Sequence, residues 1–515
     1  MNARTDGPGE LRGLALRTLF PGFAGTDVPP PRLVELINEG LGGVVLFGRN
    51  VDPVRADAGI AALTARLRAG RPDLIVAIDE EGGDVTRLDV ATGSAYPGSA
   101  ALGAADDPEL TRDVAAELAA RLRACGITVN FAPVADVDAD PRNPVIGVRA
   151  FGSDPDLVAR HSAAFVAGQQ ARGVAATVKH FPGHGATAED SHVTVPVLDA
   201  SADLLERREL VPFRAAIAAG AQVVMTAHIL VPALDPVSPA TLSPAVITGL
   251  LRGRLGYDGL VMSDGLDMQA ISGTIGHAEG AVQSLIAGVD AICIGGDSVH
   301  LDLVDRMAAA IVQAVRDGRL AYDRLVEAAG RVRALARWTG AVAEPNGQVD
   351  VVPAGVRAAR RAVTARGVTP LASAPLVLEL QDEPSLAAGF VPWGVGAPLA
   401  ARMPGTVVVP VHETGPSLPA VLARNADRPV VVAVRGVRRR RWQLAAVATI
   451  RELRPDAVVV DHELSEPGQF AAPYVLAYGA ARVTAEAVAD LLTLTPTSSP
   501  APTPGDHATM PDTTT

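Results

Sequence analysis

Residues 1 to about 340 repeat one pattern: a short β-branched or apolar run, a loop with Gly, Asp, Asn or His, then a helical stretch rich in Ala, Leu and Arg. This alternation is typical of parallel βαβ units. The expected strands are LALRTLF (14–20), GGVVLF (42–47), LIVAID (74–79), ITVNFAPV (127–134), AATVKHF (175–181), QVVMTAH (222–228), GLVMSD (259–264) and DAICIG (290–295). A helix could also claim residues 14–20. Eight units in this length predict a (β/α)8 barrel, with an open doubly wound sheet as the alternative.

The chain changes character after the eighth unit. Residues 341–355, AVAEPNGQVDVVPAG, combine Pro, Asn and Gly and predict a linker, which a helix near VRAARRAVTA (356–365) follows. Beyond residue 375, apolar runs alternate with Ala- and Leu-rich stretches, as in a smaller α/β sandwich with its own parallel sheet. Its expected strands are APLVLEL (374–380), GTVVVPV (405–411), RPVVVAVRG (428–436) and DAVVVDH (456–462).

These patterns divide the 515 residues into four parts. We predict an α/β protein with a (β/α)8 barrel at 1–340, a linker with a helix at 341–372, and a C-terminal α/β sandwich domain at 373–493. Residues 494–515 are rich in Pro, Ser and Thr and nearly free of large apolar residues. Because such a segment cannot bury enough surface to become ordered, we expect a disordered tail.

Charge and cysteine content exclude several classes of function. The formal net charge is −12 with acidic and basic residues interspersed, so we expect no nucleic-acid partner. The arginine run RGVRRRRW (435–442) is an exception, which we interpret as a solvated structural face. Cys125 and Cys293 lie in apolar surroundings and are expected to be small core residues rather than members of a disulfide or thiolate metal site.

The amino terminus, MNARTDGPGELRG, lacks the apolar core of a secretory signal. No uninterrupted apolar run reaches the length that a membrane span requires. The sequence therefore predicts a cytoplasmic protein without a membrane partner.

The stretch KHFPGHGATAEDSH (179–192) holds three of the ten histidines of the chain. The strand AATVKHF should end near its lysine, which places Lys179 and His180 at the mouth of the barrel, where barrel enzymes have their active sites. Asp190 and His192 stand two residues apart on the following loop. In an irregular loop this spacing lets the carboxylate hold and polarise the imidazole, so the pair is a candidate acid/base dyad.

A metal site is the alternative for this stretch, since His180, His184, Asp190 and His192 are all acceptable ligands for a divalent cation. The stretch lacks a known ligand signature such as HExxH, and the neighbouring lysine would repel the ion. We therefore favour acid/base chemistry and predict no metal. His184, which lies between two glycines, is expected to make a loop-shaping hydrogen bond.

Three further motifs place charged residues after predicted strands. They are IDEEGGDVTRL (78–88) with Asp79 and Arg87, NPVIGVRAFG (143–152) with Arg149, and GLVMSDGLDM (259–268) with Asp264. Any one of these residues could be an ion pair or a helix cap. Several charged clusters at successive strand ends indicate instead one catalytic centre, in which the carboxylate of Asp264 can attack the anomeric carbon of a sugar.

Together these motifs resemble those of glycoside hydrolase family 3, and specifically its β-N-acetylglucosaminidase branch. The resemblance covers roughly residues 10–340, and its most specific element is KHFPGHGATAEDSH. The segments LGGVVLFGRN (41–50) and NFAPVADVD (130–138) are also similar to family segments.

The resemblance implies roles for individual residues. Asp264 resembles the nucleophile, His192 the general acid/base and Asp190 the residue that orients this histidine. The residues that resemble the sugar-binding set are Asp79, Arg87, Arg149, Lys179 and His180. Asp84 stands where the family more often has an arginine, so the family pattern does not define the rim of the binding site or the leaving-group preference here.

The resemblance further implies a retaining exo-β-N-acetylglucosaminidase without a cofactor, which acts as a monomer on oligosaccharides such as peptidoglycan fragments. Histidine in place of a carboxylate acid/base does not repel an approaching anion, so an N-acetylglucosaminide phosphorylase is the nearest alternative enzyme. A sugar-binding or regulatory barrel without turnover is the alternative from another class, because a fold does not fix a function.

Overall fold

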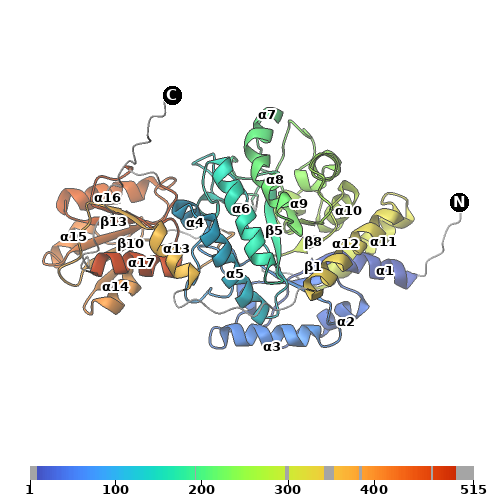
Figure 1. Cartoon of the computed structure of the whole chain (residues 1–515), viewed down its shortest axis with the longest axis horizontal. Coiled ribbons are helices and arrows are strands. Elements are labelled where there is room, and N and C mark those ends of the chain that lie inside the picture. The colour runs from blue at the N-terminus through green and yellow to red at the C-terminus, as the bar shows by residue number, and fades with distance from the viewer. Residues whose placement is uncertain are drawn as a thin grey trace, which may run out of the picture.

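The computed structural model describes residues 8–191, 193–295, 301–341, 353–381, 386–465 and 468–494. Figure 1 shows two α/β bodies side by side, an N-terminal domain coloured blue to yellow and a C-terminal domain coloured orange to red. The α/β class and the presence of a second domain are confirmed. Residues 495–515 of the predicted disordered tail and residues 342–352 of the predicted linker lie outside the described residues.

The described part of the N-terminal domain contains eight parallel strands. Strands β2 to β7 form a six-stranded sheet in chain order, and β1 pairs with β8. Isolated parallel bridges join Gly22 to Val45 and Met262 to Ala291. The strands are β1 (Leu19–Pro21), β2 (Gly43–Leu46), β3 (Ile75–Ile78), β4 (Val129–Asn130), β5 (Ala175–Phe181), β6 (Val223–Thr226), β7 (Leu260–Ser263) and β8 (Ile292–Ile294).

Two predicted strands differ from the structure. Residues 14–17, predicted as the start of the first strand, belong instead to helix α1 (Pro8–Arg17), which has Glu10 in its first turn and Arg17 in its last. The predicted strand 127–134 is reduced to β4 (Val129–Asn130). Pro133 has no backbone N–H to donate to a ladder, and the Asn130 side chain binds the backbone of Glu80.

Helices connect the strands and cover them from outside (Figure 1). Two of these helices, α5 and α6, pack side by side. The helices of this domain after α1 are α2 (Pro31–Glu39), α3 (Ala56–Arg68), α4 (Ser99–Ala105), α5 (Pro108–Ala124), α6 (Pro155–Gln170), α7 (Ala202–Leu204), α8 (Leu210–Ala218), α9 (Gln269–Ser272), α10 (His277–Ala287), α11 (Leu301–Arg316) and α12 (Tyr322–Ala341). A π-helix, Ala245–Arg254, follows β6. None of the described helices is long and apolar enough to cross a membrane.

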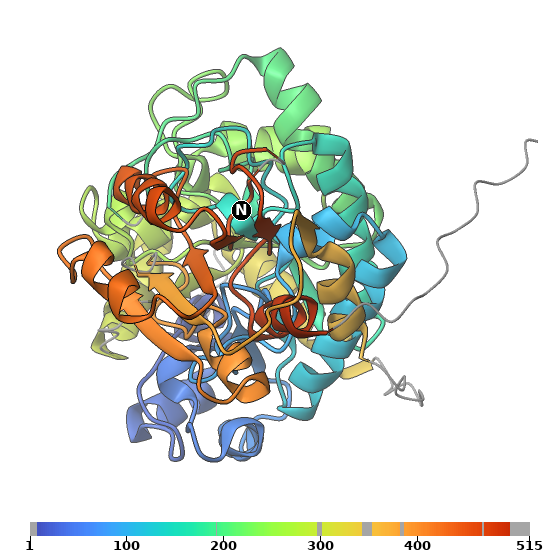
Figure 2. The ribbon, with the colours of Figure 1, turned by 90° about the vertical axis from the view of Figure 1, so that its left-hand side faces the viewer.

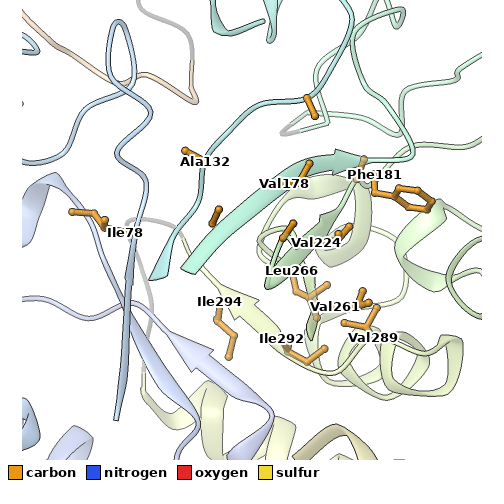
Figure 3. Packing of buried hydrophobic residues seen from close by; sticks show 14 of the residues in the cluster. Ile78, Ala132, Val178, Phe181, Val224, Val261, Leu266, Val289, Ile292 and Ile294 are labelled. Carbon is orange, nitrogen blue, oxygen red and sulfur yellow. The ribbon is translucent and has the colours of Figure 1, made fainter. Parts of the chain in front are cut away.

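Successive side chains of a strand enter two different apolar clusters, because a strand alternates its faces. Val261 of β7 belongs to the same apolar cluster as Val178 and Val224, and this cluster also includes residues of the surrounding helices. Figure 3 shows the side chains that the strands contribute to it. Its neighbours Leu260 and Met262 belong to a second cluster, formed mostly by the strands. Cys125 lies in the first cluster and Cys293 in the second, which confirms that both are small core residues; neither forms a disulfide.

The C-terminal domain is built on a six-stranded sheet of order β11-β10-β12-β13-β14-β9. The four predicted strands are all present and parallel, as β10 (Leu376–Leu380), β11 (Val407–Val411), β12 (Val430–Val434) and β13 (Val458–Asp461). The prediction missed β14 (Tyr474–Leu476) and the antiparallel β9 (Thr364–Arg366), which are only three residues long. The helices are α13 (Ala354–Ala362), α14 (Gly396–Arg402), α15 (Leu418–Arg424), α16 (Arg441–Leu453) and α17 (Arg482–Thr493).

Figure 2 views the molecule from the side of the C-terminal domain, which lies in front of the N-terminal strands. The arginine run predicted to be a solvated face is instead part of the contact between the domains. Arg435 forms a 2.7 Å ion pair with Asp84, and Arg438 a 2.7 Å ion pair with Asp138. The interpretation as a solvated face is wrong for these two residues, because both carboxylates are buried and require a cationic partner.

Candidate active site

A cavity of about 490 Å³ opens at the carboxyl ends of the strands of the N-terminal domain. It is lined by residues that follow β2, β3, β4, β5, β7 and β8 or lie near the ends of the strands, and also by residues 386–390 of the C-terminal domain. Six of the predicted site residues line it, namely Asp79, Arg87, Arg149, Lys179, His180 and Asp264. Asp190 is not among the lining residues, and His192 lies outside the described residues.

Lys179 joins two carboxylates at the bottom of this cavity. Its position in β5 gives it the same orientation as Ala175, which packs in the cluster formed mostly by the strands, since the side-chain period of a strand is two. Its Nζ lies 2.7 Å from Oδ1 of Asp79 and 2.7 Å from Oε1 of Glu81. The ammonium group is thus held between the loop after β3 and its own strand.

Glu81 is a site residue that the sequence analysis missed. Arg149 donates two hydrogen bonds to it, from Nε at 3.0 Å and from Nη2 at 2.8 Å. Burial would raise the pKa of Glu81, but the charges of Arg149 and Lys179 outweigh burial and hold the pKa well below its usual value. Glu81 therefore remains a carboxylate that orients two cations toward the cavity.

His180 is fixed by a carboxylate that the motif analysis did not assign. Its Nδ1 lies 2.7 Å from Oδ2 of Asp136, and Oδ1 of the same carboxylate accepts from the backbone N–H of His184 at 2.7 Å. Burial would raise the pKa of Asp136. The electrostatic interaction and hydrogen bond with His180, together with interactions with His184, outweigh burial and lower the pKa of Asp136 below its usual value. Asp136 lies within NFAPVADVD, so the signal was its place in a segment similar to the family.

His184 makes the hydrogen bonds predicted for it. Nδ1 lies 2.7 Å from Oγ1 of Thr187 and Nε2 lies 3.2 Å from Oγ of Ser191, so both ring nitrogens are used within the loop. Burial, with the nearby His180 charge, lowers the pKa of His184 to about 4 against the opposing effect of Asp136. The ring is therefore neutral at ordinary pH.

Asp190 lies half-buried in the turn after this loop. Its backbone carbonyl accepts from the N–H groups of Val193 and Thr194, at 3.0 and 3.1 Å. The dyad of Asp190 and His192 stays a prediction.

Asp264 follows β7 directly and is half-buried at the edge of the cavity. Its Oδ1 accepts from the N–H of Gly265 at 2.8 Å. This position at a strand end is the one the motif predicted, and it brings a carboxylate to the same cavity as Lys179 and His180.

Arg87 is held by both domains. Its guanidinium donates to the carbonyls of Ala388 at 3.1 Å and Ala387 at 2.8 Å, and it lies 4.0 Å from Oδ2 of Asp79. Asp84 does not line this cavity; it accepts from the N–H of Ala480 at 2.8 Å and pairs with Arg435. The residue that departs from the family pattern thus anchors the C-terminal domain.

Among the residues that the structure describes, no group of three or more His, Cys, Asp or Glu side chains is arranged to hold a metal ion. The metal alternative also involved His192, which lies outside them.

Comparison with known proteins agrees with the motifs. Residues 32–335 match the family model described as the glycosyl hydrolase family 3 N-terminal domain. A β-hexosaminidase of Xylella fastidiosa (strain 9a5c) is 39% identical over 322 residues, which cover 60% of this chain and 94% of that protein. A solved family 3 β-N-acetylglucosaminidase from Paenibacillus sp. str. FPU-7 is 33% identical, with a TM-score of 0.82, and the match covers 94% of this chain and 96% of that one.

A third relative spans a smaller part of the chain. The crystal structure of a β-N-acetylhexosaminidase from Beutenbergia cavernae DSM 12333 is 33% identical, with a TM-score of 0.58, and covers 65% of this chain but 100% of its own. The fold, the polar cavity at the strand ends and these similarities define a glycoside hydrolase. The chain belongs to glycosyl hydrolase family 3, where its motifs and relatives group it with the β-N-acetylglucosaminidase branch.

Proposed function

We propose that this glycoside hydrolase is a retaining exo-β-N-acetylglucosaminidase that releases terminal N-acetylglucosamine from peptidoglycan fragments or related oligosaccharides. The observation that carries the proposal is that Asp264 lines one cavity with Lys179, His180 and Arg149. A sugar ring offers hydroxyl and amide groups on its rim, and these charged side chains can bind them by hydrogen bonds. The names of the relatives from Xylella and Paenibacillus support the choice of sugar.

In the proposed mechanism, Asp264 attacks the anomeric carbon and forms an ester bond to the sugar. Protonated His192 gives its proton to the glycosidic oxygen, so the bond to the leaving group breaks as a neutral alcohol departs. Neutral His192 then takes a proton from water, and the hydroxide attacks the anomeric carbon and frees Asp264. Two inversions leave the product with the configuration of the substrate.

The ion pairs beneath the cavity support a role in sugar binding for Asp79, Arg149, Lys179 and His180. Each of these side chains is fixed by a partner, as Lys179 is by Asp79 and Glu81, so little side-chain entropy is lost when a hydroxyl group binds. Arg87 donates hydrogen bonds to the C-terminal domain, and we propose that it also binds the sugar.

We also propose that the eight strands close into a (β/α)8 barrel. The parallel pairing of β1 with β8 and the bridges Gly22–Val45 and Met262–Ala291 connect the two sheets at both junctions, which supports closure. A closed barrel brings the carboxyl ends of all strands to one mouth.

A product assay tests the proposed function. Aryl N-acetyl-β-glucosaminide and aryl β-glucoside are each incubated with the enzyme, in buffer with and without inorganic phosphate. We expect release of N-acetylglucosamine from the first substrate only, at a rate that does not respond to phosphate. Formation of N-acetylglucosamine 1-phosphate would establish the phosphorylase instead, and no turnover of either substrate would contradict a hydrolase.

A further inference from the structure

We propose that residues 386–390 of the C-terminal domain form the leaving-group subsite, in which Phe390 and Leu386 receive the apolar face of the sugar that departs. This inference rests on the proposed function and assigns a part of its substrate site to the second domain. The leaving group that this chain favours is then a ring with an apolar face.

The exposure of the two side chains is the first observation. Phe390 is 79% exposed and Leu386 is 63% exposed, and both line the 490 Å³ cavity. Single exposed apolar residues are common on protein surfaces, but here two large ones occur within five residues at the edge of a substrate cavity. Since so much of their surface stays in water, they contribute little to folding by burial, whereas a bound ligand can bury it.

The second observation is that this segment is attached to the sugar-binding side chains. Arg87 donates to the carbonyls of Ala387 and Ala388, so the backbone between the two apolar residues faces the N-terminal domain. Ala388 is buried, and Gly389 has a φ of 68°, which lets the chain turn outward before Phe390. The turn therefore holds the two apolar side chains at the edge of the cavity.

The two sides of the cavity differ in chemistry. The N-terminal domain contributes all of the charged lining residues, among them Asp79, Arg149 and Lys179, which suit the hydroxyl and acetamido groups of the terminal sugar, together with apolar ones such as Phe47 and Phe131. The segment 386–390 contributes two apolar side chains and no charged one. A pyranose ring also has a face of C–H groups, which packs on an aromatic ring. A disaccharide whose terminal sugar occupies the charged part can thus lay its second ring on Phe390.

Substrates with large and small leaving groups separate this role from a general effect on catalysis. We would measure kcat/KM for N,N′-diacetylchitobiose, whose leaving group is a sugar, and for N-acetyl-β-glucosaminyl fluoride, whose leaving group is one atom. We expect Phe390→Ala to lower kcat/KM for the disaccharide by about tenfold, mainly because KM rises. For the glycosyl fluoride, we expect kcat/KM to change by less than about twofold. Leu386→Ala should act in the same direction with a smaller effect.

Two further variants serve as controls. Leu453→Ala removes a leucine that is 49% exposed on the same domain at the end of α16, outside the cavity, and should leave both substrates unchanged. Phe390→Trp keeps an aromatic face and should retain the preference for the disaccharide. If wild type cleaves both substrates and Phe390→Ala slows both equally, or slows neither, the subsite is wrong while the proposed function stands. If wild type cleaves neither, the proposed function fails.

Discussion

Oδ2 of Asp136 lies 2.7 Å from Nδ1 of His180; both side chains are buried, and His180 lines the cavity. A carboxylate can only accept, so Nδ1 carries the hydrogen and Nε2 is the ring nitrogen available to a ligand. The carboxylate that fixes this tautomer follows β4, whereas the histidine is part of β5. The proposed role of His180 in binding the sugar would therefore depend on Asp136, which does not line the cavity.

Asp136→Asn tests this dependence. The amide has the same shape but can present its NH2 group to Nδ1, which would reverse the tautomer of His180. We expect kcat/KM for an N-acetylglucosaminide to fall by about 10- to 100-fold, as for a lost hydrogen bond to a charged group. Steady-state kinetics on the folded variant measures this, and unchanged kinetics would show that the tautomer of His180 is irrelevant.

Glu81→Gln should remove the charge that balances two buried cations. Lys179 and Arg149 both contact Glu81, and all three side chains are buried. We expect the free energy of unfolding to fall by about 3 kcal/mol, because loss of one member leaves buried charge uncompensated, and activity to fall with it. Denaturant unfolding and initial rates provide the two readouts. A variant as stable and as active as wild type would refute the role of Glu81.

The adjacent Glu80→Gln is a matched control with a different prediction. Burial raises the pKa of Glu80 to about 7, although hydrogen bonds from Thr86 and from the N–H groups of Leu88 and Arg87 oppose the shift. Between the unfolded value of about 4.3 and this value, the folded state holds a proton that the unfolded state lacks, so stability falls as pH rises through this window. Glutamine does not titrate.

We therefore compare the free energies of unfolding of Glu80→Gln and wild type at about pH 5 and about pH 8. The difference should shift in favour of the variant at the higher pH, by roughly 3 kcal/mol at most. Its activity should change little, because Glu80 does not line the cavity. Chemical denaturation at the two pH values tests the sign. A stability difference that is the same at both would contradict a raised pKa for Glu80.

The ion pair between Asp84 and Arg435 should contribute to the attachment of the two domains. Asp84 is buried and also accepts the N–H of Ala480, so Asp84→Ala leaves a cation and a donor without their acceptor. We expect a loss of about 3 kcal/mol and a coupling of about 1–3 kcal/mol in a double-mutant cycle with Arg435→Ala.

Asp140→Ala is the control for this pair. Asp140 also forms a 2.7 Å ion pair, with Arg142, but that arginine is 76% exposed. Exposed pairs contribute about 1 kcal/mol or less, so this variant should be close to wild type. Equal effects of the two substitutions would show that the contact between the domains adds no stability through Asp84.

The repeated strand and helix pattern predicted the positions of the strands well where apolar runs are long and uninterrupted. AATVKHF is strand β5 over its full length, Ala175–Phe181. The start of the first strand was misplaced because LALR belongs to helix α1, and β9 and β14 were missed because three residues give no periodicity. Sequence patterns detect long elements more readily than short ones.

Among the candidate site residues, those that follow a strand directly could be predicted because the strand end fixes their location. Asp79 and Asp264 are of this kind. Glu81 and Asp136 were not identified as site residues, since their partners come from other segments of the chain: Arg149 and Lys179 contact Glu81, and His180 contacts Asp136. The interpretation of Arg435 and Arg438 was wrong for the same reason: their partners, Asp84 and Asp138, are 300 or more residues away in sequence.

The most direct test of the proposed mechanism is to identify the residue that becomes bonded to the sugar. The enzyme is incubated with a 5-fluoro derivative of N-acetylglucosaminyl fluoride, which slows both steps and lets a glycosyl-enzyme accumulate, and peptides are then analysed by mass spectrometry. We predict that one sugar is attached to the peptide containing Asp264, and that Asp264→Asn abolishes labelling and lowers kcat by at least about 10³-fold. An active enzyme that is labelled at another residue, or that hydrolyses the substrate with inversion, would contradict the assignment.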